Sequence, residues 1–351
     1  MSERRSKPTL NDVARLAGVS PSSASRVFLG QKKVSDETRR RVLDVARDIG
    51  YVPQSLSRRT ALMDNRTIGL LLRDVSNPSY GQLFSEIHSA AELRGWKLAT
   101  MAVIAGKNDD AQVDSLSSLV GMGVAGLIVA TGDLPSDVLE PFGTHIPIVR
   151  AGRPEPKRLI HAVSYDAEAA GRELADLVLG AGHTRIAVVR TRRETSLPEW
   201  TRASAMIRTI RSAGLEPFVV DVGNFTGEEY VLPLVQSGAV TVVMCPTDRR
   251  QLTYLRVFHE NGLRVPEDVS VTGCDGLVLG LELMGLTTYR WPVRHVAQTA
   301  VDVIIDLIER HGTPDSRRSL VNVKLPGEII PGRTLGPPRA RRDEKGAARQ
   351  G

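Results

Sequence analysis

The spacing of apolar positions changes along this 351-residue chain. Up to roughly residue 50, apolar residues recur every three or four positions, which is typical of short amphipathic helices. From Ile68 onward, short continuous apolar runs alternate with amphipathic stretches, which is typical of buried parallel strands separated by helices. The pattern predicts a small all-α head followed by an α/β core.

The segment TLNDVARLAGVSPSSASRVFLG, at positions 9–30, predicts two helices joined by a tight turn. Thr9 can cap the first helix with Asp12 as its acidic partner. Ser20 can cap the second helix, with Pro21 at the first position, where a missing N–H costs nothing. This is the layout of a helix-turn-helix DNA reader, although the segment alone would also fit a two-helix hairpin without a DNA-binding role.

The two faces of these helices differ in polarity. The expected inward residues are Val13, Leu16, Ala17, Ala24, Val27 and Phe28. Gly18 is expected at the turn because a side chain there would crowd the second helix. The open face carries Ser22, Ser23, Ser25 and Arg26, and short polar residues with one arginine suit a DNA major groove.

A third helix is predicted from about Ser35 to Ile49, with Ser35 as its cap. We therefore predict a DNA-binding domain at 8–53 and a polar hinge or linker at 54–66. The three arginines at 39–41 can contact phosphates or face water, and the sequence leaves this choice open.

The remainder of the chain predicts two doubly wound parallel-sheet lobes within 67–335. The expected strands are IGLLL, KLATMAV, GLIVAT, IPIV, RIAVV, PFVV, VTVVMC and VSVTG. The expected helices include Tyr80–Arg94, Ala167–Leu179, Trp200–Ala213 and Val293–Arg310. Ligands of such sheets bind beyond the carboxyl ends of the strands, so we expect a cleft between the lobes. Residues 336–351 have the composition of a disordered tail.

Charge is distributed unevenly. Residues 1–60 hold 13 basic and 6 acidic residues, whereas residues 61–335 hold 28 and 32. A basic head on a mildly acidic body favours a phosphate-binding module joined to a part that does not bind DNA, although a solvated charged surface is the alternative.

Other classes of protein find little support. The sequence shows no phosphate-binding glycine loop, zinc-spaced His/Cys cluster or nucleophile elbow, so we expect no enzyme activity, no cofactor and no metal. The two cysteines favour a reducing cytoplasm over a disulfide framework. We expect neither a signal peptide nor a membrane span.

The chain resembles the lactose-repressor (LacI/GalR) family of bacterial transcription regulators, whose core is periplasmic-binding-protein-like. In the head, the matching residues are Asp12-Val13-Ala14, Ala17-Gly18-Val19-Ser20, Ser25-Arg26-Val27 and Val34-Ser35. In the core, they are Asn77-Pro78-Ser79-Tyr80, Gly182-His183-Thr184-Arg185-Ile186 and the run from Val265 to Val271. The resemblance covers roughly residues 8–335, and its motifs are specific in combination.

The resemblance implies how this chain would contact DNA. The implied DNA-binding residues are Thr9, Ser20, Pro21, Ser22, Ser23, Arg26, Arg58 and Arg59. In the family, the hinge forms a helix on DNA and wedges a leucine into the minor groove. Thr60 stands at that position here, so Leu56 or Leu62 could substitute, or the segment could be a flexible linker.

The resemblance also implies effector-binding residues in the core. These are Tyr80, Tyr165, Asp166, Arg202, Phe225, Asp248, Asp275 and Trp291. Packing is the alternative role for Tyr80, a plain surface position for Arg202, and helix capping for Asp248. Gly276 and Thr247 depart from the common pattern, and Trp291 replaces a common glutamine and could narrow the pocket.

These inferences predict a sequence-specific regulator, most simply a repressor controlled by a small-molecule effector such as a sugar. The expected partners are double-stranded operator DNA, the effector and a second copy in a homodimer or a dimer of dimers. The expected location is the cytoplasm, on the nucleoid. The alternative is a ligand-independent architectural DNA binder with a vestigial core. The sequence leaves open the effector, the operator and the choice between inducer and corepressor.

Overall fold

The computed structural model describes residues 8–28, 34–49, 51, 66–73, 78–103, 109–131, 134–223, 227–311 and 320–340. The chain divides into two compact units, each built from pieces that are distant in sequence. The first unit comprises Met1–Ser164 and Val293–Lys324, and the second comprises Tyr165–Pro292 and Leu325–Gly351.

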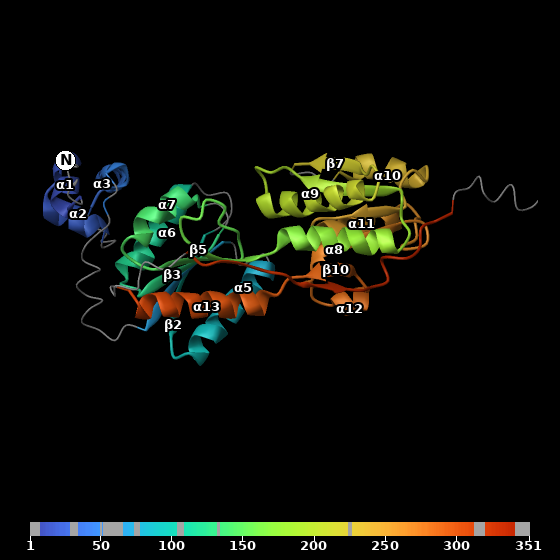
Figure 1. Ribbon diagram of the computed structural model, residues 1–351. Coiled ribbons are helices and arrows are strands. Elements are labelled where there is room, and N and C mark those ends of the chain that lie inside the picture. Colours follow the sequence, from blue (N-terminus) through green and yellow to red (C-terminus); the bar gives the residue numbers. More distant parts are fainter. Residues whose placement is uncertain are drawn as a thin grey trace, which may run out of the picture. The chain divides into compact units, whose positions relative to one another are not determined.

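The head contains three helices, α1 (Leu10–Leu16), α2 (Pro21–Phe28) and α3 (Asp36–Asp48) (Figure 1). The Thr9 hydroxyl accepts a hydrogen bond from the Asp12 N–H, and the Asp12 carboxylate accepts one from the Thr9 N–H at 2.9 Å. This reciprocal capping box confirms the predicted start of α1.

The start of α2 also agrees with the prediction. Ser20 Oγ accepts a hydrogen bond from the Ser23 N–H at 3.1 Å, and Pro21 is the first helical residue. The three helices enclose a small apolar core of their own. Its buried members are Val13, Ala14, Ala17, Ala24, Val27, Val42, Ala46 and Tyr51.

Two details of the head differ from the sequence-based expectation. Leu16 was expected to point inward but is 51% exposed, and Ala14 takes the buried position instead. Gly18 is not required by crowding, because a Cβ built there meets nothing within 4 Å. Its φ of +65° explains the glycine, since the left-handed region is costly for residues that carry a Cβ.

The first unit contains a six-stranded sheet in the order β2–β1–β3–β4–β5–β11. Its strands are β1 (Thr67–Arg73), β2 (Lys97–Val103), β3 (Gly126–Ala130), β4 (Ile148–Ala151), β5 (His161–Tyr165) and β11 (Asn322–Leu325). Strands β1 to β5 pair in parallel.

Helices cover both faces of this sheet. They are α5 (Pro78–Leu93), α6 (Asp109–Gly121), α7 (Ser136–Gly143) and α13 (Val293–Glu309). Leu127 belongs to the core cluster shared with α6 and α7. A Cβ at neighbouring Gly126 would instead meet Ile304 and Ile308 of α13. Successive residues of β3 therefore face different helices. On its face of the sheet, α13 lies beside α5 (Figure 1).

The second unit repeats this plan with the order β7–β6–β8–β9–β10–β12. Its strands are β6 (Ile186–Thr191), β7 (Phe218–Val222), β8 (Val242–Met244), β9 (Ser270–Asp275), β10 (Thr287–Arg290) and β12 (Glu328–Ile330). Its helices are α8 (Ala167–Gly180), α9 (Leu197–Ser212), α10 (Glu228–Gln236), α11 (Asp248–Glu260) and α12 (Leu281–Met284). Strand β12 pairs antiparallel with β10, and the printed pairs among the other five strands are parallel.

The two sheets confirm the predicted α/β core of two doubly wound lobes. In each sheet the strand order reverses beside the first strand of the unit, between β1 and β3 and between β6 and β8. Such switch points are where doubly wound sheets bind ligands, at the carboxyl ends of the strands. The fold therefore directs the search for a site to those two edges.

The prediction missed how the chain is shared between the units. Strands β5 and β10 were not predicted, because each is short and lacks a long apolar run. After completing most of the second sheet, the chain returns to supply α13 and β11 to the first unit. Each unit therefore depends on segments far apart in sequence.

The predicted tail begins too early. Residues 336–340 are part of the second unit, where the buried His183 side chain bridges Thr241 and the Gly336 carbonyl, each at 2.9 Å. The Gly336 N–H donates to Ser270 Oγ at 3.1 Å, and Arg185 donates to the Arg339 carbonyl. Residues 341–351 lie outside the described part of the chain.

Helices α8 and α9 approach each other closely at Gly171. A Cβ at this position would collide with the Arg202 carbonyl and lie 2.8 Å from the Ala205 Cβ. Glycine therefore lets α8 press against the part of α9 that carries Arg202.

We expect Gly171→Ala to lower the free energy of unfolding by about 1–3 kcal/mol, because the added methyl group forces the two helices apart. Gly180→Ala is the matched control on the same helix, since a Cβ there meets nothing within 4 Å. Urea titration followed by tryptophan fluorescence measures both variants. Equal stability of the two variants would contradict the packing argument.

Candidate functional site

The predicted base-reading residues lie along α2 in the head. Pro21, Ser22 and Arg26 are exposed, and Ser23 is half-buried. Ser20 Oγ lies 2.9 Å from the hydroxyl oxygens of both Ser22 and Ser23. The surface is thus a small hydroxyl cluster with an apolar ring and one guanidinium, a combination that can contact base edges and phosphates.

The remaining predicted DNA contacts have different outcomes. Thr9 is exposed, but its hydroxyl is used in the capping box of α1. Arg39 is partly taken up by the head itself, because its guanidinium donates to the Val27 carbonyl at 3.4 Å. The hinge residues Leu56, Arg58, Arg59, Thr60 and Leu62 lie outside the described residues.

Three predicted effector residues meet at the carboxyl edge of the second sheet. Asp275 is the last residue of β9, Trp291 directly follows β10, and Arg202 lies in α9, which follows β6. Trp291 Nε1 donates to Asp275 Oδ1 at 2.9 Å, and an Arg202 nitrogen lies 3.6 Å from the same oxygen. The Arg202 guanidinium also stacks on the Trp291 ring, 5.0 Å from its centroid.

Arg202 is only 4% exposed, so its charge needs compensation. Burial alone would lower the pKa of Arg202, but neighbouring acidic groups including Asp275 and Glu199 outweigh it and raise the pKa. Among the described residues, no hydrogen-bond acceptor meets Arg202 Nε. The guanidinium is therefore a charged group at the sheet edge with an unused donor, and the interpretation as a plain surface arginine is wrong.

Asp275 is held in an unusual backbone conformation. Its φ of +133° is sparsely populated by residues with a Cβ and costs of order 1–3 kcal/mol. Trp291 holds both ends of the residue, because its backbone N–H donates to the Asp275 carbonyl at 3.1 Å and its indole to the carboxylate. Burial raises the pKa of Asp275 to about 7, against the opposing effect of Arg202.

The aromatic residues pack against one another. Tyr165 stacks on Trp291 with ring centroids 5.1 Å apart, and Tyr289 meets the same indole edge-on at 5.4 Å. Trp291 is 5% exposed. Its ring faces are therefore engaged within the protein, which supports a role in orienting Asp275 and Arg202.

Asp248 was expected to contact the effector or to cap α11, and in the structure it holds the turn after Asp275. The cap of α11 is Thr247, whose hydroxyl accepts from the Arg250 N–H. The Asp248 carboxylate is buried and accepts from the Gly276 N–H at 2.7 Å and from the Thr288 hydroxyl. Asp248 thus anchors the turn directly after Asp275.

Gly276 is required by this turn. Its φ is +66°, and a Cβ would lie 2.5 Å from the Arg290 Cα. Glycine at this position departs from the family pattern. It lets the backbone adopt the turn in which the Gly276 N–H donates to Asp248.

Two further predicted residues do not join the cluster as ligand contacts. Asp166 is the cap of α8, and its Oδ1 accepts from the N–H groups of Glu168 and Ala169. Asp166 Oδ1 therefore serves the helix terminus, and the expected effector contact of this residue stays a prediction. Phe225 lies outside the described residues.

Sequence reasoning missed the acidic partner on α9. Glu199 accepts from the Thr191 hydroxyl at 2.6 Å and lies 3.6 Å from an Arg250 nitrogen. The signal was available, since Glu199 precedes Arg202 by one helical turn and would share its face. Glu199 connects the ends of β6 and the start of α11 to the site.

Tyr80 belongs to the first unit, in the first turn of α5. Its hydroxyl accepts a hydrogen bond from Arg153, which follows β4, at 2.9 Å. Both side chains are half-buried. The sequence offered no motif for Arg153, which lies in a loop without an apolar pattern.

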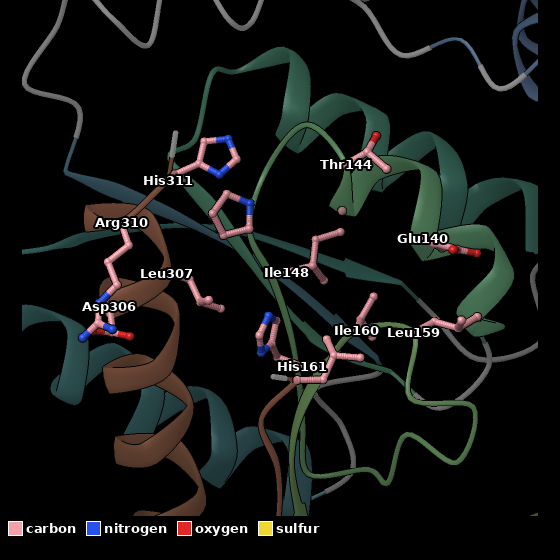
Figure 2. A pocket seen from close by; sticks show the side chains of 13 residues that line it. Glu140, Thr144, Ile148, Leu159, Ile160, His161, Asp306, Leu307, Arg310 and His311 are labelled. Atoms are coloured by element: carbon pink, nitrogen blue, oxygen red, sulfur yellow. The ribbon is translucent and has the colours of Figure 1, made fainter. Parts of the chain in front are cut away.

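A cavity of about 300 Å³ lies elsewhere in the first unit, at the amino-terminal ends of β4 and β5. Figure 2 shows Ile148, Ile160, His161 and Leu307 around it. Its described lining residues include none of the predicted effector contacts. The cavity is therefore separate from the carboxyl edges that carry Tyr80 and Asp275.

The described residues contain no group of three or more His, Cys, Asp or Glu side chains placed to hold a metal ion. Cys245 and Cys274 are buried and free, and burial raises the pKa of both thiols. Within the described helices, none is long and apolar enough to cross a membrane.

Comparison with known families matches both parts of the chain. Residues 9–54 match the family described as bacterial regulatory proteins, lacI family. Residues 175–335 match the family described as periplasmic binding protein-like domain.

Characterised relatives align along most of the chain. Catabolite control protein A of Priestia megaterium is 27% identical over 317 residues, which cover 88% of this chain and 94% of the relative. The transcriptional repressor PurR of Vibrio campbellii is 28% identical over 312 residues, covering 86% and 92%. The transcriptional repressor CytR of Escherichia coli K12 is 27% identical over 311 residues, covering 86% and 90%.

Solved structures share the fold. The lac repressor dimer bound to operator and an anti-inducer has a TM-score of 0.68 at 22% identity, with 94% of this chain and all of that chain covered. The regulator CelR in complex with cellobiose has a TM-score of 0.67 at 24% identity, with 93% and 100% covered.

Together, the head, the core and the relatives define a sequence-specific DNA-binding transcription regulator. The head matches the lacI family of bacterial regulatory proteins, and the core matches the periplasmic binding protein-like domain. The predicted resemblance and functional class are confirmed, and the relatives are transcription regulators.

The raised pKa of Asp275 leads to a prediction about pH. In the unfolded chain this carboxyl titrates near pH 4, and in the folded protein at about pH 7, so stability from this group rises as pH falls through 7 and levels off below pH 4. We expect Asp275→Asn to remove this gain. Urea unfolding between pH 5 and pH 8 measures it, and identical pH profiles for variant and wild type would contradict the burial argument.

Proposed function

We propose that this protein is a repressor whose homodimer binds a near-palindromic operator and whose DNA affinity is set by a hydroxylated small molecule. The observation that carries the proposal is the presence, in one chain, of an exposed helix-turn-helix face and the Arg202–Asp275 pair at the carboxyl edge of a doubly wound sheet. We further propose that it acts in the cytoplasm, on the nucleoid.

On DNA, α2 serves as the recognition helix. Arg26 suits bidentate bonding to guanine, and Pro21 can contact a thymine methyl group. Thr9, Ser20, Ser22 and Ser23 supply hydroxyls to phosphates and bases near the ends of α1 and α2. We assign Arg58 and Arg59 to the minor groove at the operator centre, by analogy with the family.

At the second sheet, the Arg202–Asp275 pair offers both donors and acceptors to vicinal hydroxyls. The Arg202 guanidinium donates, and the Asp275 carboxylate accepts. These groups bind and orient a polyol without the nucleophile and base that catalysis would need. The relative CelR was solved with cellobiose, which supports a sugar-like effector for this chain.

Effector and operator must influence each other reciprocally. If the effector lowers the affinity for the operator by a given factor, the operator lowers the affinity for the effector by the same factor. The coupling free energy is typically about 1–3 kcal/mol. Asp275 has a strained φ and is hydrogen-bonded to Trp291. We therefore propose that effector binding changes the conformation of this turn.

The second unit carries an exposed apolar patch suited to dimerisation. Leu279 is 98% exposed and Leu283 is 85% exposed, and Met284 lies beside them on α12. Exposed apolar clusters of this kind mark interaction surfaces. We assign the patch to the homodimer interface.

The test of the proposed function is selection of genomic DNA fragments by the full-length protein, repeated with a panel of sugars. Enrichment of one palindrome that is lost or gained with one compound would support a ligand-gated repressor or its corepressor-dependent counterpart. Failure to enrich any sequence under every condition would refute it in favour of architectural DNA binding.

Arg26→Ala should reduce the preference for the selected operator by about 1–3 kcal/mol, because its base contact is lost, and should leave the salt-sensitive binding to phosphates. Arg40→Ala is the control, since Arg40 is exposed on α3 outside the proposed reading face. Fluorescence anisotropy with operator and scrambled DNA measures both variants. Unchanged discrimination by the Arg26 variant would refute its role as a base reader.

The double substitution Leu279→Asp with Leu283→Asp should raise the dimer dissociation constant at least about tenfold, because it places charge in a desolvated patch. Tyr230→Asp is the control at an exposed apolar residue on α10. Sedimentation equilibrium measures the mass and also distinguishes a dimer from a dimer of dimers. An unaltered dissociation constant would exclude this patch from the interface.

A further inference from the structure

We infer that Arg153 and Tyr80 form an anion-recognising subsite, so that the effector is an acidic, hydroxylated molecule bearing a carboxylate or phosphate group. The inference rests on the proposed effector-controlled function and narrows the effector class.

The two residues meet at the carboxyl edge of the first sheet. Tyr80 lies in the first turn of α5, the helix after β1, and Arg153 lies two residues beyond the end of β4. Strands β1 and β4 flank β3, so the hydrogen bond between Arg153 and the Tyr80 hydroxyl spans the end of β3. This edge includes the switch point of the sheet, where doubly wound folds bind ligands.

Arg153 has no acidic partner within the part of the chain that the structure describes. Among the described residues no carboxylate lies within ion-pair distance of its guanidinium, and the Tyr80 oxygen is its hydrogen-bond partner. The nearby acids are occupied: Glu155 pairs with Arg150, and Asp137 pairs with Lys157. A half-buried guanidinium with unused donors suits a carboxylate or phosphate, because its planar fork matches the two oxygens of either group.

Tyr80 completes the subsite. Its oxygen accepts the bond from Arg153, so its O–H is available to donate. An anion placed against the pair would therefore receive N–H and O–H donors together. This geometry assigns the phenol a binding role in place of the simple packing role left open by the sequence.

The loop that carries Arg153 is rigidly held. Arg150 is 4% exposed, pairs with Glu155 at 3.1 Å and donates to the Thr131 and Leu134 carbonyls. Glu155 also accepts from the Ser136 hydroxyl. These buried contacts fix the loop on both sides of Arg153, so the guanidinium is oriented before a ligand arrives.

The contrast with Arg202 separates two kinds of recognition. Asp275 balances the Arg202 charge, so that pair suits neutral hydroxyls, whereas no carboxylate of the described residues pairs with Arg153. A sugar acid or a sugar phosphate carries the anion that the Arg153 guanidinium suits, and a neutral sugar does not.

The experiment is thermal unfolding of the full-length protein with matched sets of hexoses and pentoses at constant ionic strength. Each set contains the neutral sugar, its sugar acid and its phosphate ester. We expect an acidic member to raise the melting temperature by several degrees at about one hundred times its dissociation constant, and its neutral parent to have a much smaller effect. The two acidic arms distinguish carboxylate from phosphate recognition.

Variants then test the residue assignment. Arg153→Gln should remove the response to the acidic ligand, Arg153→Lys should retain part of it, and Tyr80→Phe should weaken it. Arg249→Gln is the control at an exposed arginine of α11 and should respond like the wild type. The melting temperature of each variant without ligand, with circular dichroism, verifies folding.

The inference is overturned if no acidic compound exceeds its neutral parent, or if folded Arg153→Gln responds like the wild type. A neutral sugar that shifts the melting temperature would still sustain the proposed function. Absence of operator selection in the preceding experiment would refute the proposed function itself, independently of these ligands.

Discussion

A buried positive charge organises the carboxyl edge of the second sheet. Arg202 lies almost wholly out of water, and an isolated ion in that position would be strongly unfavourable. Asp275 supplies the opposite charge, Trp291 supplies a π face, and Gly171 lets the neighbouring helix approach. The strained backbone at Asp275 and the anchored turn at Gly276 follow from the need to deliver a carboxylate to that point.

Much of the fold could be predicted because it depends on local signals. The caps at Thr9 and Ser20 and the apolar runs of most strands are readable within a few residues. The cap at Asp166 is local as well, because its partners are the N–H groups of Glu168 and Ala169. The role of Asp248 could not be read in this way, because packing brings its partners, Gly276 and Thr288, from distant parts of the sequence.

Arg153 shows the other limit of sequence reasoning. A lone arginine in a loop carries no periodic or motif signal, and its meaning depends on which acids are nearby and whether they are occupied. Arg150, three residues earlier, is chemically identical and is neutralised by Glu155. Only the three-dimensional arrangement distinguishes the balanced guanidinium from the unbalanced one.

The order in which the chain completes its parts has a consequence during synthesis. The head has its own core, which ends at Tyr51. The first unit is completed only by α13 and β11. The second unit is completed by β12 and by Gly336, whose carbonyl is hydrogen-bonded to His183. A nascent chain can therefore fold its DNA-reading helices while both effector-sensing units still lack their last segments. Folding of the head therefore precedes completion of either unit, and the interval between them is set by translation of residues 52–336.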